Sequence, residues 1–115
     1  MFKFQTLTVW QKAMELADLL CEIADGLPQK YQFSFADQLR RAALSIPSNI
    51  AEGNGRKTKK DSNHFYVVSY GSVMESMNIL ILLSKRGIWV ADEGFKRKIY
   101  DLSTEVCKML TGISK

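Results

Sequence analysis

The sequence has 115 residues, a length that fits one domain, and 46% of them are hydrophobic, which is enough for a single core. Two prolines and seven glycines exclude a collagen-like or low-complexity chain. The formal net charge is +4. A net charge of this size says little about partners unless it is concentrated in one place, where an anion would then dock.

Membrane and secretory segments are not expected. The longest unbroken apolar run, residues 79–83, is far shorter than the ~20 residues that a membrane-spanning helix needs. The N-terminus has no long apolar run and no small-residue cleavage site of the kind found in signal peptides. Cys21 and Cys107 lie inside helical patterns, which is typical of small buried hydrophobes in a reducing cytoplasm, although a disulfide between them stays open. We therefore expect a cytoplasmic protein without a membrane anchor.

The first predicted helix begins at Thr8, because Gln11 follows at the spacing of a capping box. Apolar residues then recur in steps of three and four, as on one face of a bundle helix. They are Trp10, Ala13, Ala17, Leu20, Ala24 and Leu27. Gly26 and Pro28 are expected to end the helix.

Ser34 and Asp37 repeat the capping-box spacing at the start of a second helix. Its apolar face comprises Phe35, Leu39, Ala42, Ile46 and Ile50. Pro47 lies inside this pattern, where it removes a backbone donor and clashes with the preceding turn. We expect either a kink near 43–45 or two helices that meet at Pro47, with Gly53 ending the segment.

Thr58 and Asp61 form a third box, Gly87 is a suitable C-terminal cap, and Asp92 is placed to cap a fourth helix. The fourth apolar face is regular and comprises Phe95, Ile99, Leu102, Val106, Met109 and Ile113. No segment alternates with the period of two that indicates a strand. The sequence therefore predicts a single all-α domain over 1–115, an up-down antiparallel four-helix bundle whose second helix is kinked at its proline.

The segment SIPSNIAEGNGRKTKKD, residues 45–61, contains a cluster of cations. We call Arg56, Lys57, Lys59 and Lys60 the basic loop. Its four charges equal the net charge of the whole chain, because the cations and acids elsewhere cancel. The glycines around it suggest a mobile backbone. The loop is either a solvated turn or a nucleic-acid-binding site, to which Arg41 is a possible addition.

The position of the lysines favours the second interpretation. Lys59 and Lys60 would lie in a first helical turn, where the helix dipole disfavours cations. A bound phosphate would relieve this conflict, since it accepts hydrogen bonds from the free amides and neutralises the lysines.

The other polar candidates have structural explanations. Asn49 can satisfy backbone groups freed by Pro47, and Glu52 can hold Arg40 or Arg41, although Arg40 has other acids within reach as partners. The acids Glu15, Asp18, Glu22 and Asp25 form a stripe on the first helix, which is either a solvated face or a contact with basic residues of a neighbouring subunit. His64, the single histidine, follows Asp61 by one turn and more often forms a solvated pair than a catalytic dyad. We expect no catalytic residue, no metal site and no cofactor.

Several motifs resemble those of bacterial four-helix-bundle proteins encoded in intervening sequences of 23S ribosomal RNA. They are LTVWQKA (7–13), QLRRAA (38–43), SIPSNIAEG (45–53), GR (55–56), and Gly71-Ser72 with Glu75. The resemblance implies an up-down bundle that assembles as a ring-shaped homopentamer. The family is similar, more loosely, to accessory proteins of diversity-generating retroelements, which are basic pentamers that bind nucleic acid and a reverse transcriptase. The chain departs from the family pattern at Asn54 and at 62–64.

Two functions follow from these residues and this resemblance. The first is a non-catalytic nucleic-acid-binding pentamer, more probable for RNA, that contacts phosphates through Arg56, Lys57, Lys59, Lys60 and Arg41. The second is a protein-interaction scaffold that recruits a partner enzyme such as a reverse transcriptase. The two differ in salt dependence, because phosphate contacts weaken steeply with salt and a packed protein interface does not.

Overall fold

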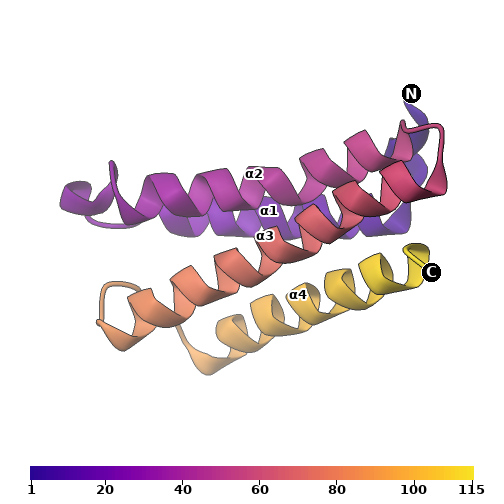
Figure 1. Cartoon of the computed structure of the whole chain (residues 1–115). Helices are drawn as coiled ribbons and strands as arrows, with labels where there is room; N and C mark the ends of the chain where they lie inside the picture. The colour runs from indigo at the N-terminus through magenta and orange to yellow at the C-terminus, as the bar shows by residue number, and fades with distance from the viewer.

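The computed structural model describes residues 1–115 and contains four long helices and no strand. The helices are α1 (Thr8–Asp25), α2 (Phe35–Asn54), α3 (Lys59–Lys85) and α4 (Glu93–Ile113). Successive helices run in opposite directions, as Figure 1 shows. The predicted all-α four-helix bundle is confirmed.

Two short 3₁₀ turns, η1 (Lys3–Thr6) and η2 (Gln29–Tyr31), were not predicted. In η1 the ring of Phe4 packs edge-on against Trp10, with centroids 5.3 Å apart, so η1 covers the first turn of α1. In the α1–α2 connection, the Gln32 side chain donates hydrogen bonds of 2.9 Å to the carbonyls of Ala24 and Leu27, which satisfies the end of α1.

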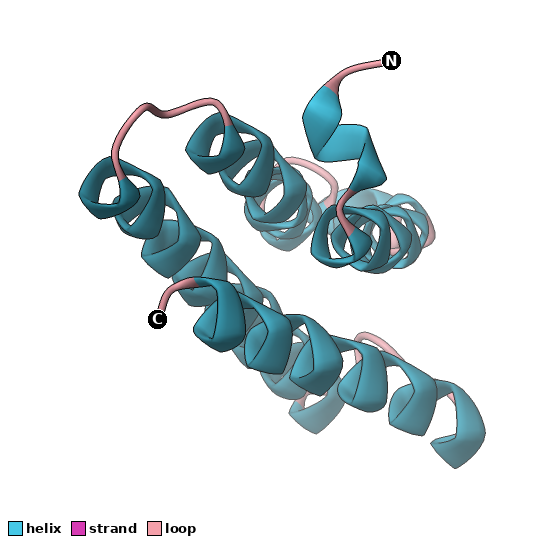
Figure 2. Cartoon of the chain, turned by 90° about the vertical axis from the view of Figure 1, so that its right-hand side faces the viewer, coloured by secondary structure: helices cyan, strands magenta, loops and turns pink.

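The core lies between the inward faces of all four helices, and its largest fully buried side chains are aliphatic. They include Leu16 and Leu20 of α1, Leu39 and Ile46 of α2, Leu83 of α3, and Ile99 and Leu110 of α4. The view along the bundle in Figure 2 shows α1 and α2 together on one side, with α3 and α4 on the other.

The helix ends test the predicted caps. The hydroxyl of Thr58 accepts from the Asp61 amide at 3.2 Å, and Oδ1 of Asp92 accepts from the Phe95 amide at 2.8 Å, so both caps are confirmed. Gly87 has φ +68°, and the Ile88 amide donates to the Leu83 carbonyl at 2.9 Å, which completes a glycine-terminated C-cap.

The predicted capping boxes of α1 and α2 are wrong. Thr8 is the first residue of α1 rather than its cap, and the cap position, Leu7, has no polar side chain to offer. Ser34 occupies the cap position of α2, but its hydroxyl donates back to the Tyr31 carbonyl at 3.4 Å because its backbone is not extended.

Pro47 is buried inside α2, which continues as one helix from Phe35 to Asn54. The alternative of two helices meeting at Pro47 is therefore wrong, while the kink stays a prediction. The end of α2 also differs from the prediction, because Gly53 lies within the helix and Gly55 is the capping residue.

By length and composition alone, α3 is the single helix that could cross a membrane. One such helix is weak evidence, because the core helix of a soluble protein meets the same criterion. In this bundle the inward side of α3 contributes Val73, Ile79, Leu80 and Leu83 to the core.

Candidate nucleic-acid interface

The basic loop lies at one end of the bundle, where residues 55–58 connect α2 to α3. The chain termini lie at the same end, on the right in Figure 1. Nδ2 of Asn63, in the first turns of α3, donates to the carbonyl of Ser114 at 2.7 Å, so the end of α4 is tied to the start of α3. Lys115 follows directly and adds a cation to this end of the molecule.

The glycines had suggested that the backbone of the loop is mobile. The backbone beside the loop is instead closely packed. A Cβ atom on Gly53 would lie 2.7 Å from Cε1 of Tyr66 and 3.0 Å from the carbonyl oxygen of Ser62. Since real Cβ atoms do not approach other atoms so closely, Gly53 is needed where α2 meets α3. The loop is therefore held by a fixed helix pair.

Arg56 is fixed within the loop. Its Nη2 lies 3.0 Å from Oε1 of Glu52, one turn earlier in α2, and its guanidinium lies 4.5 Å from the centroid of the Phe65 ring. Glu52 thus pairs with Arg56, and not with Arg40 or Arg41 as the sequence had suggested. α2 continues past Gly53 to Asn54 and is capped by Gly55, so Arg56 follows directly after the last helical turn, which contains Glu52.

Lys57, Lys59 and Lys60 are exposed and form no ion pair. Lys59 and Lys60 are the first two residues of α3, whose free amides give that end a partial positive charge. Asp61 is the one acid in the first turn. The three lysines and the helix end therefore form a positive surface whose charge is not balanced within the chain.

Arg41 lies apart from the basic loop. It is on α2, where its Nε is 2.9 Å from Oδ2 of Asp37. The thirteen residues from Arg41 to Asn54, where α2 ends, correspond to about 20 Å along the helix. Within one chain Arg41 and the basic loop are therefore separate cationic positions.

Arg40 and Asn49 hold the bundle together locally. Nη2 of Arg40 donates to Oε1 of Gln32 at 2.6 Å, and its Nε lies 3.6 Å from Oδ1 of Asp25, so it joins the α1–α2 connection to both helices. Nδ2 of Asn49 donates to the carbonyl of Ser45 at 2.8 Å and to its hydroxyl at 2.9 Å. The carbonyl that loses its partner to Pro47 is that of Ala43, so Asn49 supports the neighbouring turn instead.

The remaining polar candidates are His64, the two cysteines and the acidic side chains. No group of three or more His, Cys, Asp or Glu side chains could hold a metal ion. His64 is exposed and packs edge-on against Phe65, with ring centroids 5.3 Å apart. Both cysteines are free, and burial raises the pKa of each thiol; near Cys21 the carboxylates of Asp25 and Asp18 raise it further. Neither thiol is therefore activated as a nucleophile.

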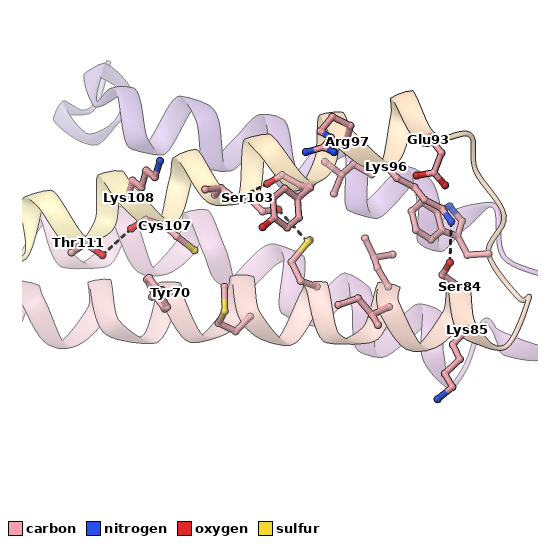
Figure 3. A pocket seen from close by; sticks show the side chains of 18 of the residues that line it. Tyr70, Ser84, Lys85, Glu93, Lys96, Arg97, Ser103, Cys107, Lys108 and Thr111 are labelled. Carbon is pink, nitrogen blue, oxygen red and sulfur yellow. Dashed lines mark hydrogen bonds between the residues drawn. The ribbon is translucent and has the colours of Figure 1, made fainter.

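A groove of about 1160 Å³ lies between α3 and α4 and was not predicted from the sequence. Its apolar lining includes Met74, Met77 and Ile81 of α3 and Trp89 of the α3–α4 connection. Figure 3 shows the groove from close by, with Tyr70 of α3 facing Cys107 and Thr111 of α4. The signal in the sequence is the spacing of Tyr70, Met74, Met77 and Ile81 in steps of four, three and four. That second apolar stripe lies beside the buried one on the same helix.

The fold and its charged end define a class: an all-α bundle with an unbalanced cationic surface at one helix N-terminus. The chain belongs to the family of 23S rRNA-intervening sequence proteins, whose family model matches residues 5–112. No curated protein matches the sequence significantly.

Proposed function

We propose that this protein is a non-catalytic, cytoplasmic nucleic-acid-binding protein that acts on RNA through its basic loop, as a ring-shaped homopentamer. The observation that supports it best is the group of three unpaired lysines at the N-terminus of α3. A phosphate at this position would accept from the free amides of the helix end and neutralise the lysines.

The aromatic residues near the loop favour phosphate contacts over base recognition. Phe65 is half-buried and its ring is covered by Arg56, while Tyr66 is buried. Neither ring is free to stack on an unpaired base, so contacts would be largely independent of base sequence.

Assembly into a homopentamer would raise the affinity of the protein for RNA. Three or four cations on one chain give weak binding, whereas five copies of the loop on one ring would engage a single polynucleotide together. The free thiols of Cys21 and Cys107 fit a reducing compartment such as the cytoplasm.

The test is fluorescence anisotropy with a labelled single-stranded RNA. The variant Lys57→Gln, Lys59→Gln, Lys60→Gln should lose binding, whereas Arg56→Gln should weaken it less because Arg56 is already paired. A matched variant, Lys30→Gln, Arg86→Gln, Lys98→Gln, removes the same charge far from the loop and should bind as the wild type does. Wild-type binding should weaken with salt by a log–log slope of about −0.7 for each phosphate neutralised.

Two results would contradict the proposal. If both triple variants bind alike, net charge rather than the loop determines binding. If wild-type binding to RNA is absent or insensitive to salt, the protein is better explained as a scaffold for a partner enzyme such as a reverse transcriptase. Light scattering tests the ring separately, by a mass five times that of one chain.

A further inference from the structure

The groove between α3 and α4 exposes apolar side chains that a monomer would normally bury. Met74 is 46% exposed, Ile81 is 68% exposed, and Tyr100 on the α4 side is 63% exposed. They line one continuous groove, and contiguous exposed apolar surface of this kind is typical of an interaction site. The spacing of the α3 residues matches the heptad pattern by which a helix receives another helix.

The rim of the groove is positively charged. Five of its lining residues are basic and one, Glu93, is acidic. The basic residues are Lys85, Lys96, Arg97, Lys108 and Lys115. Only Lys96 has a polar partner within the chain, because its Nζ donates to the hydroxyl of Ser84 at 3.1 Å, as Figure 3 shows. The occupant should therefore present a helix with acidic side chains.

The same chain offers such a helix face on α1. Glu15, Asp18 and Glu22 are exposed there and form no ion pair, and Asp25 extends the row toward its partner Arg40. The three acids share one face of α1, because positions 15, 18 and 22 differ by steps of three and four. That face lies on the side of α1 opposite its buried residues. Met14, 44% exposed, lies in the same face and supplies an apolar side chain.

The charged rows have matching lengths. Glu15 and Asp25 are about 15 Å apart along α1, and Arg97 and Lys108 are about 16 Å apart along α4, at 1.5 Å per residue. Acids and cations can therefore meet at both ends of one helix pairing. Within a single chain they cannot, since the acidic face of α1 points away from the core that it shares with α4.

We infer that the α3–α4 groove receives the acidic face of α1 from a second copy of this chain. The contact uses two different surfaces, so each copy keeps one free groove and one free α1 face, and repeated contacts close into a ring. This inference rests on the ring proposed above and assigns its interface.

The test is sedimentation velocity on two charge-reversed variants without RNA. The α1 variant is Glu15→Lys, Asp18→Lys, Glu22→Lys; the groove variant is Arg97→Glu, Lys108→Glu. Each should dissociate to single chains, with at least a tenfold rise in the dissociation constant between subunits. An equimolar mixture should reassemble, because each variant then finds the opposite charge on the other. The control Arg86→Glu, Lys98→Glu changes the net charge by as much as the groove variant does, but at positions outside both faces. It should remain assembled.

Four outcomes would overturn the inference. Wild type that is a single chain at all concentrations removes the ring itself, whereas intact rings in both variants leave the ring but not this interface. Dissociation of the groove variant alone means that another face or another protein fills the groove. Dissociation of both without reassembly on mixing means that the two surfaces are not partners. Circular dichroism of each variant checks that the helices remain, and RNA binding is measured separately.

Discussion

The two sides of α3 are built differently. Toward α2, its side chains are small and buried, with Ser69 and Ser76 fully enclosed. Toward α4, its side chains are long and partly exposed, with Met74 and Ile81 lining a groove. One helix thus forms a closed contact on one side and an open one on the other.

Serine makes the closed contact possible because its side chain is small and its hydroxyl finds a hydrogen-bond partner inside the contact. The Ser69 hydroxyl donates to the carbonyl of Ile46 at 2.8 Å, and the hydroxyls of Ser72 and Ser45 lie 2.7 Å apart. Gly53 extends this close approach to the end of α2. On the open side the large side chains keep the helices apart, which leaves surface for another molecule. The closed side therefore contributes mainly to stability, and the open side is the surface that we propose for assembly.

The largest difference should appear between Leu83 and Ile81, two aliphatic residues of α3. Leu83 is fully buried, so Leu83→Ala should lower the free energy of unfolding by about 2–5 kcal/mol through lost burial and a cavity. Ile81→Ala should change it by less than about 0.5 kcal/mol, because Ile81 is on the open side. Urea denaturation of chains dissociated by dilution measures both. Equal losses for the two would mean that the open side is closed within one chain.

Gly53, on the closed side, and Gly71, an exposed glycine of α3, should respond to substitution with opposite signs. Gly53→Val forces a side chain against Tyr66 and the Ser62 carbonyl and should cost about 1–3 kcal/mol. A Cβ on Gly71 meets nothing within 4 Å, so Gly71→Ala should stabilise the helix by about 0.5–1 kcal/mol. Thermal denaturation should show melting temperatures on opposite sides of the wild type. A tolerated Gly53→Val would show that α2 and α3 separate easily at the loop.

Removing a serine hydroxyl from each side should produce a smaller difference in the free energy of unfolding. Ser69→Ala removes a buried hydrogen bond to the Ile46 carbonyl and should cost about 1 kcal/mol. Ser84→Ala removes the hydroxyl that accepts from Lys96 at the groove, and its effect should be within about 0.5 kcal/mol because the pair is partly solvated. Chemical denaturation resolves the two. A larger loss for Ser84→Ala would reverse the comparison.

The closed side could be predicted from the sequence only in part. The apolar faces of α1, α2 and α4 have a clear period, and their residues Leu20, Ile46 and Val106 are buried as expected. In α3 apolar residues occur all round the helix, so the pattern could not decide which face is inside: Val68 is 39% exposed, whereas Val73 is fully buried. The role of Gly53 was also missed, because a glycine near a turn indicates a helix end unless the neighbouring helix is known.

The candidate site shows the same limit. Thr58 correctly located the start of α3, and with it the lysines of the basic loop. The pairing of Arg56 with Glu52 depends on where α2 ends, which the sequence did not determine. The groove depends on the separation of α3 and α4. That distance follows from the packing of side chains, and it cannot be predicted from the sequence pattern of either helix alone.

The smallest effect that we predict concerns the pH dependence of Tyr66, a buried residue of the closed side. Burial raises the pKa of its phenol above the usual value near 10.0, because the ionised form is poorly solvated there. The contribution of Tyr66 to stability is therefore complete below pH 10 and is lost as the pH rises through its raised pKa, since the unfolded chain releases the proton first.

Tyr66→Phe removes this ionisable group, so its free energy of unfolding should fall less steeply than that of the wild type above pH 10. Any titration that wild type and variant share cancels in their difference, so the informative quantity is the difference in free energy of unfolding between wild type and variant at each pH. Tyr70→Phe makes the same chemical change on the open side and serves as the matched control. Urea denaturation between pH 8 and 11 measures the three slopes. Parallel slopes for wild type and Tyr66→Phe would mean that water reaches the phenol of Tyr66, and that the contact between α2 and α3 is less closed at the loop than its packing indicates.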